Sequence, residues 1–229
     1  MWQAIYDDYQ NKGFVVIAVA MDNDIEAARP WIEDAKPTYP VLIDRYHQLA
    51  DLYNMVNVPQ AVWIDEAGHI VRPPENAGAF EGFRALDFTT MTIPDEVAAT
   101  AQSSRATYIA AIRDWAENGA DSPHIFTPEQ AEALLVAPDE NVAKAHVLFR
   151  LGLYLREAGQ GEEAKALLAQ ASALHPQSWT IWRQAADTLD NGLAGGPAFW
   201  QRVNALGQDH YYKPVDMAGM PTDRPPKPQ

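Results

Sequence analysis

The spacing of apolar residues near the start of the chain predicts helices and strands in alternation. Trp2 to Asn11 carries apolar residues at helical spacing and is followed by Lys12-Gly13, a typical helix end. Phe14 to Met21 is an unbroken apolar run, which favours a strand covered on both faces in a parallel sheet. Helical spacing returns from Ile25 to Ala35, where Pro30 either lies near the first turn or kinks the helix.

The next segment predicts a short strand, a further helix and a hairpin. Tyr39 to Ile43 is short and apolar, and Tyr46 to Met55 places its apolar residues on one helical face. Ala61 to Asp65 and His69 to Arg72 are two strand-like runs joined by the tight turn Glu66-Ala67-Gly68, which predicts a β-hairpin.

After the hairpin the sequence predicts a linker, then helices, and finally a Pro-rich tail. Pro73 to Thr92 lacks periodicity and is rich in Pro, Gly and Asn, which favours a linker or an active-face loop. Pro94 to Asn118 has helical spacing, and Thr127-Pro128-Glu129-Gln130 has the residues of a capping box. The predicted fold class is α/β followed by all-α. The predicted parts are an α/β domain at 1–75, a linker at 76–93, a helical domain at 94–206 and an extended, partly mobile Pro-rich tail at 207–229.

Residues 143–190 have a spacing that resembles the tetratricopeptide repeat. The residues expected to pack two antiparallel helices together are Leu148, Leu151, Gly152, Leu155, Ala164, Leu168, Ala171 and Pro176. Small residues at 152 and 171 allow a close approach, and Pro176 ends the second helix. A period of about 34 residues leads from Leu148 to Trp182, which predicts the first helix of a second repeat running through Leu189. Its second helix, roughly Ala198 to Leu206, fits the pattern less well.

Two roles are open for these helices. Such repeats commonly present a concave face to a peptide or to another domain. Fewer than three repeats rarely stand alone, so the helices could instead pack on the first domain as a structural cap or a dimerisation element. The sequence does not choose between the two roles.

Charge and cysteine content exclude several classes of function. The chain has 31 acidic residues against 17 Lys and Arg, a net charge of −14. This charge repels phosphate backbones and anionic lipids over a Debye length of about 8 Å, so neither nucleic acid nor a membrane is an expected partner. We expect a soluble protein without signal peptide or membrane-spanning segment, in a compartment that the sequence leaves open. The chain has no cysteine, so these residues alone cannot carry out disulfide exchange.

Two motifs of the first domain carry a family resemblance. They are Asn57-Val58-Pro59-Gln60 with the hairpin that follows, and the run from Lys12-Gly13 through Val19. Both resemble the thioredoxin-like thiol-disulfide oxidoreductases of the ResA and TlpA type and the related peroxiredoxin-like (AhpC/TSA-related) group. The resemblance covers residues 1 to about 75 and enters the family fold just after its Cys motif. It therefore implies an incomplete thioredoxin-like sheet that lacks the first strand.

The resemblance also implies a binding loop. Val58-Pro59 is similar to the family's cis-proline, so Val58, Pro59 and Gln60 would line a loop that faces a substrate or partner. The alternative is an ordinary trans proline that opens a strand. The family's first strand is central, so the strands at 14–21 and 61–65 either pair directly or leave a gap for another segment. Because unpaired buried backbone groups cost free energy, a homodimer that completes the sheet is one way to fill that gap.

Other chemistry receives little support from the residues. The six histidines show no pair at the i, i+4 spacing of helical metal ligands. Asp44 and His47 could form a carboxylate and imidazole pair, but a solvated helix start is the simpler explanation. His146 and His175 are expected to face solvent or to cap a helix end. We therefore assign no catalytic residue, no metal and no cofactor.

Two functions follow from these observations. The first is a non-catalytic, cysteine-free thioredoxin-like and tetratricopeptide-like protein that binds a protein or peptide or serves assembly. The alternative is a truncated form of a thiol- or selenol-dependent oxidoreductase whose catalytic motif lies upstream of Met1.

Overall fold

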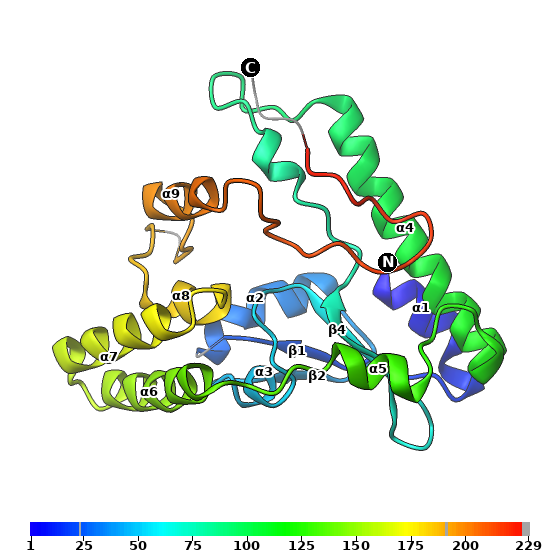
Figure 1. Cartoon of the computed structure of the whole chain (residues 1–229), viewed down its shortest axis with the longest axis horizontal. Coiled ribbons are helices and arrows are strands. Elements are labelled where there is room, and N and C mark those ends of the chain that lie inside the picture. The colour runs from blue at the N-terminus through cyan, green and yellow to red at the C-terminus, as the bar shows by residue number, and fades with distance from the viewer. Residues whose placement is uncertain (23, 191, 226–229) are drawn as a thin grey trace. The chain divides into compact units, whose positions relative to one another are not determined.

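A computed structural model describes residues 1–22, 24–190 and 192–225 (Figure 1). The contacts divide the chain into two compact units. The first unit consists of Met1–Val56 and Val136–Ala186, and the second of Asn57–Leu135 and Asp187–Gln229. The elements of the predicted domain 1–75 are shared between the two units, and the predicted domain boundaries stay a prediction. The last four residues of the predicted tail, 226–229, lie outside the described residues.

The first unit contains a two-stranded sheet and two groups of helices, one from residues 1–56 and one from residues 136–186. Its elements are α1 (Trp2–Tyr9), the 3-10 turn η1 (Gln10–Lys12), β1 (Ala18–Ala20), α2 (Ile25–Ala35), β2 (Val41–Ile43), α3 (Gln48–Leu52), α6 (Glu140–Glu157), α7 (Gly161–Leu174) and α8 (Trp179–Ala185). Local hydrogen bonds explain where the helices begin. The Asp24 side chain accepts from the backbone N–H of Glu26 and starts α2, which has the predicted bounds with Pro30 inside the helix.

The strand predicted at 14–21 is shorter than its apolar run. β1 pairs in parallel with β2, in the register Ala18 with Val41 and Ala20 with Ile43. Val15 and Ile17 are each 56% exposed, so the prediction of a strand covered on both faces is wrong. The physical reason is that β1 has β2 along one edge, whereas no other described strand pairs with it.

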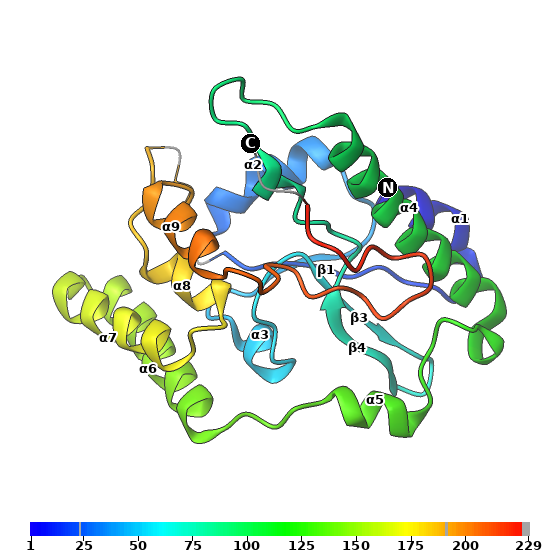
Figure 2. The same cartoon turned by 45° about the horizontal axis from the view of Figure 1, so that its top comes forward.

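The second unit combines a β-hairpin with one long helix. Its elements are β3 (Gln60–Ile64), β4 (Ile70–Asn76), the 3-10 turn η2 (Gly82–Ala85), α4 (Asp95–Asn118), the 3-10 turn η3 (Gly119–Asp121), α5 (Pro128–Leu134) and α9 (Pro197–Ala205). The predicted capping box of α5 is confirmed: Thr127 accepts from the N–H of Gln130, whose side chain accepts from the N–H of Thr127. Figure 2 shows β3 and β4 side by side.

The hairpin is longer than predicted and contains a bulge. β4 continues to Asn76, through the Pro73-Pro74 pair that we assigned to a loop. Trp63 pairs with Arg72 and Ala61 with Glu75, so two prolines lie opposite one residue of β3. A bulge interrupts the ladder, and prolines are tolerated there because they have no N–H to donate.

The strands predicted at 14–21 and 61–65 do not pair directly with each other. β1 pairs with β2 and β3 pairs with β4, in two separate sheets. Direct pairing between the strands at 14–21 and 61–65, the first of our two alternatives, is therefore wrong for the described residues. A second copy that completes the sheet stays a prediction.

Candidate functional site

The proline loop precedes β3 in the second unit. The Val58–Pro59 peptide bond is cis. Asn57 is buried, and its side-chain oxygen accepts from the N–H of Val58 at 3.0 Å. The carbonyl of Pro59 accepts from the N–H of Ala77 at 3.4 Å, which ties the loop to the end of β4. Val58 itself is 38% exposed, so part of the loop remains accessible.

The C-terminal segment 207–225, which we call the strap, lies against this loop. The Asn57 amide donates to the carbonyl of Tyr211 at 3.1 Å, and the Asn76 amide donates to the carbonyl of Lys213 at 3.2 Å. The Tyr212 hydroxyl donates to the carbonyl of Val58 at 3.3 Å. The strap is the dark orange to red trace of Figure 2, which follows α9. It thus engages the backbone of the loop that the family resemblance assigns to a substrate or partner.

A buried ion pair anchors the strap at a second point. Glu81, with a side chain 2% exposed, accepts from Arg84 at 2.8 Å. Its carboxylate also lies 2.6 Å from Nδ1 of His210 and accepts from the N–H of Tyr211 at 2.9 Å. Arg84 donates in turn to the carbonyl of Asp209 at 2.9 Å. The pair therefore holds both the side chains and the main chain of the strap.

Arg72 is the centre of another buried polar network. Its guanidinium donates to both carboxylate oxygens of Glu75, at 2.7 and 2.8 Å, and to the carbonyls of His124 and Asp216 at 2.5 and 2.9 Å. The Phe126 ring lies 4.3 Å from the guanidinium carbon. Arg72 thereby joins the hairpin to the segment before α5 and to the strap.

Tyr108 of α4 extends this network. Its hydroxyl donates to Glu75 at 3.1 Å and accepts from the indole N–H of Trp63 at 2.9 Å. Burial, and then the neighbouring Glu75 carboxylate, raise the pKa of Tyr108 well above its ordinary value. Because the Tyr108 hydroxyl stays protonated, it cannot act as a general base. Its hydrogen bonds to Trp63 and Glu75 position the hairpin of β3 and β4 on α4.

Sequence reasoning missed the polar residues of the second unit. Asn57 and Asn76 lie far in sequence from the carbonyls that they bind, so no local spacing indicates them. The charge pairs offered a weak signal, since Arg72 with Glu75 and Glu81 with Arg84 are each three residues apart in apolar surroundings. Arg72 ends the predicted hairpin, whereas Glu75, Glu81 and Arg84 lie in the segment predicted to be a linker or an active-face loop.

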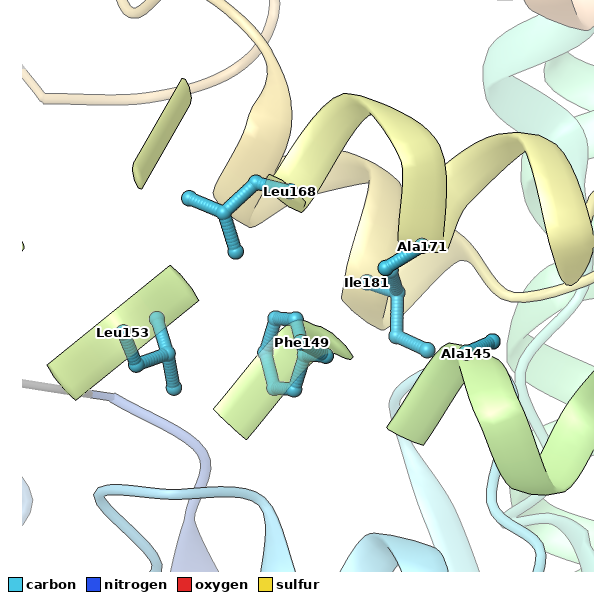
Figure 3. Packing of buried hydrophobic residues seen from close by; sticks show 6 residues of the cluster. All are labelled: Ala145, Phe149, Leu153, Leu168, Ala171 and Ile181. Atoms are coloured by element: carbon cyan, nitrogen blue, oxygen red, sulfur yellow. The ribbon is translucent and has the colours of Figure 1, made fainter. Parts of the chain in front are cut away.

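The predicted repeat residues lie in the first unit, in the hairpin of α6 and α7. Ala164, Leu168 and Ala171 are buried, and Figure 3 shows Leu168 and Ala171 of α7 facing Phe149 and Leu153 of α6, with Ile181 of α8 beside them. Leu148 packs against this cluster. A Cβ on Gly152 would lie 2.9 Å from Cγ of Leu168, so glycine is what allows the two helices this approach.

The other predicted repeat residues contribute less to the packing. Leu155 and Trp182 are half-buried, and Pro176 is exposed. Leu151 is 44% exposed, so it lies outside the core of the hairpin. The helix predicted through Leu189 ends at Ala185 as α8, and α9 belongs to the other unit. The tetratricopeptide-like assignment therefore stays a prediction.

Three histidines of the first unit are more buried than predicted. His47, His146 and His175 are 3, 6 and 5% exposed, so the expectation of a solvated His47 and of a solvent-facing His146 or His175 is wrong. His175 does lie at the C-cap of α7, the other position that we had considered for it. The carboxylate of Asp44 accepts from backbone N–H groups of Gln48 and Leu49 and starts α3 instead of pairing with His47.

Helix packing places these imidazoles together. The His47 ring lies 4.9 Å from that of Phe149, and the rings of His146 and His175 are 5.8 Å apart. Burial lowers the pKa of His47 to about 4. Burial also lowers the pKa of His146, although the Asp51 carboxylate acts in the opposite direction. The pKa of His175 is lowered first by burial and then by the positive charge that His146 carries when protonated.

Within ranges 1–22, 24–190 and 192–225, no cluster of three or more His, Asp or Glu side chains could hold a metal ion. None of the described helices combines the length and apolarity needed to cross a membrane. The thiol chemistry of the family needs a cysteine, and the sequence has none.

Comparison with known proteins adds one finding. The sequence model of the AhpC/TSA family matches residues 2–72. No curated protein and no solved structure matches the chain. The family match supports a thioredoxin-like domain, of the peroxiredoxin-related kind, in the part of the chain from α1 into β4.

Proposed function

We propose that this chain is a non-catalytic thioredoxin-like protein that binds another protein through one face of α6. The face consists of Val147, Leu151 and Tyr154, which we call the α6 face. These side chains are 59, 44 and 63% exposed. They are spaced by four and three residues, so they form one stripe along the helix. A stripe of large exposed apolar side chains is the observation that carries the proposal.

The core of the first unit does not need this face. α6 packs Ala145, Phe149 and Leu153 into the cluster with α7 and α8, and these residues are at most 1% exposed. The α6 face is therefore a second apolar surface on a helix that already has a buried one. A partner helix with its own apolar stripe fits such a surface, in the way that helices bind apolar grooves or pair side by side.

Site-specific photo-crosslinking tests this binding surface. A photoreactive phenylalanine derivative replaces Leu151 in one variant and the exposed Ala169 of α7 in a matched control, and both are irradiated in cells. We expect a crosslinked protein from position 151 that is absent from position 169 and lost when Val147→Asp and Tyr154→Asp are added. Equal crosslinking at both positions, or none at 151, would contradict the proposal.

A second assay tests the absence of redox catalysis. The full chain is incubated with dithiothreitol and either insulin or hydrogen peroxide, and turnover is compared with a protein-free blank. Because the chain has no thiol, we expect rates equal to the blank. A rate clearly above the blank would show that the protein is a catalyst after all.

A further inference from the structure

We propose that Asn57, Val58, Asn76, Glu81 and Arg84 form a binding site for a short segment of another protein that has no helix or strand, and that the strap occupies this site until such a segment displaces it. We call these five residues the strap site. The proposal concerns the second unit and is independent of the α6 face.

The contacts at the strap site recognise main chain. The carbonyls of Asp209, Tyr211 and Lys213 accept from the side chains of Arg84, Asn57 and Asn76 at 2.9, 3.1 and 3.2 Å. These carbonyls belong to alternate residues of an irregular stretch of chain, which bends at Asp209, Tyr211 and Tyr212. Donors that bind carbonyls place no demand on the side chains of those residues, so a segment of another sequence can take the same position.

One side-chain position of the bound segment is more specific. Tyr211 is 5% exposed, and its ring lies 4.9 Å from Phe83 in an edge-to-face arrangement, while its N–H donates to Glu81. Lys213, two residues further on, is exposed. The expected ligand is therefore an irregular segment with one aromatic residue at the position of Tyr211 and polar residues around it.

The strap leaves polar groups of this region unsatisfied. Gln60 Oε1 and Asn76 Oδ1 are buried and receive no hydrogen bond within the described part of the chain. The two residues are directly paired across β3 and β4, so their side chains lie on one face of the hairpin. A cavity of about 10 Å³, roughly the space of one water, lies between Asn76 and the strap residues Tyr212 and Val215. A segment that offered N–H groups to these oxygens would satisfy acceptors that the strap does not.

The strap can leave without disrupting regular structure. The described part of the strap has no helix or strand. Its buried apolar side chains are those of Tyr211, Val215 and Met220. Glu81 and Arg84 remain paired with each other when the strap departs, so no isolated charge is left behind. If the strap occupies the site about 99% of the time, the apparent affinity for a competing segment falls by about a hundredfold.

Peptide binding to the full-length chain tests the proposal. The probe is a fluorescein-labelled peptide with the sequence of residues 207–222, and its binding is measured by fluorescence anisotropy. We expect Tyr211→Ala to bind the probe at least tenfold more tightly than the wild type, because it weakens the strap. The control Lys213→Ala keeps the backbone carbonyl and should bind like the wild type. Adding Asn57→Ala to Tyr211→Ala should remove the gain.

Three results would overturn the proposal. The first is that Tyr211→Ala binds the probe no better than Lys213→Ala. The second is that Tyr211→Ala loses the near-ultraviolet circular dichroism of its tryptophans, since the strap would then be an inseparable part of the core. The third is a wild-type dimer that Tyr211→Ala abolishes, since the occupant would then be the strap of a second copy.

Hydrogen exchange on the unmodified protein gives an independent test. We expect the N–H of Tyr211 and the amides of the strap to exchange at least tenfold faster than the amides paired between β3 and β4, through separate opening of the strap. Equal protection of the strap and the hairpin would mean that both open together, and the strap would not be displaceable.

Discussion

The hairpin of α6 and α7 and the strap site hold their parts together in different ways. In the hairpin, apolar side chains from neighbouring helices interlock around Gly152. In the strap site, side-chain donors bind main-chain carbonyls across as many as 154 positions in sequence, as in the bond from Asn57 to Tyr211. Packing between neighbouring helices requires apolar residues at a regular spacing, which can be recognised in the sequence. Hydrogen bonds from side chains to distant main-chain carbonyls require no such spacing. The comparison explains why the first region was visible in the sequence and the second was not.

The difference should also appear in the response to mutation. Burial of apolar area stabilises a fold roughly in proportion to that area, so packing losses are graded. A buried polar network contributes little net stability but costs much when one member is removed, because a partner stays buried and unpaired. The second unit should therefore tolerate the replacement of a whole pair better than the loss of half of it.

Arg72→Met is the substitution with the largest expected effect. It leaves the Glu75 carboxylate without the guanidinium that now binds both of its oxygens. Breaking a buried ion pair from one side typically costs about 3–5 kcal/mol of the free energy of unfolding. Urea denaturation followed by tryptophan fluorescence measures this loss, because Trp63 stacks on Trp115 in the same unit at 5.1 Å.

The matched control replaces both partners. Arg72→Met with Glu75→Met exchanges the pair for apolar side chains of similar length. We expect it to recover part of the lost stability, because the carbonyls of His124 and Asp216 and the hydroxyl of Tyr108 still lose a partner. If the double variant were as unstable as Arg72→Met alone, the network would be a net source of stability, and the contrast between the two regions would fail.

The buried His47 predicts a pH dependence that belongs to the first unit. Its pKa is lowered from 6.5 to about 4 by burial, so the unfolded chain binds the proton more readily than the folded one. The contribution of the neutral His47 to the free energy of unfolding is complete above about pH 6.5. It falls by about 3 kcal/mol as the pH is lowered to about 4. Urea denaturation at several values between pH 7 and pH 4 measures the slope.

The groups around His47 set the control for this experiment. Asp44 opposes the lowered pKa, and His146 and Arg156 add to it. His47→Asn suits the positive φ of 52° at this residue and removes the titrating group, so its stability should fall less between pH 6.5 and pH 4. His146 and His175, whose pKa values burial also lowers, contribute to the remaining slope. His69→Asn, at a side chain 76% exposed, should keep the wild-type slope, and equal slopes in both variants would exclude His47 as the source.

Local sequence signals predicted the elements that depend on local physics. The bounds of α2, the capping box of α5 and the hairpin of β3 and β4 all follow from residues within a few positions of one another. The buried residues Ala164, Leu168 and Ala171 follow from helical spacing in the same way. Each of these features satisfies its hydrogen bonds or buries its apolar face within one short segment.

The failures are features that depend on distant parts of the chain. An apolar run such as Phe14 to Met21 predicts a covered strand, but coverage depends on neighbours that the run does not specify, and Val15 and Ile17 are exposed. His47 looked solvated because its burial comes from Phe149 of α6. The strap looked like a simple tail because its partners Asn57 and Asn76 precede it by more than a hundred positions.

Gly152→Ala is the smallest of the expected effects and tests how tightly α6 and α7 pack. The new Cβ would lie 2.9 Å from Cγ of Leu168 and 3.3 Å from the carbonyl oxygen of Ala164, so one of them must move. Overpacking costs about 1–3 kcal/mol, and alanine returns about 1 kcal/mol of helix propensity, which leaves a net loss of about 0–2 kcal/mol. Gly161→Ala is the matched control, because its Cβ would meet nothing within 4 Å at the start of α7, and it should be neutral or slightly stabilising. Urea denaturation followed by far-ultraviolet circular dichroism compares the two variants. If both were equally stable, the helices would separate without cost, and the hairpin would owe its stability to the surrounding cluster more than to close contact at Gly152.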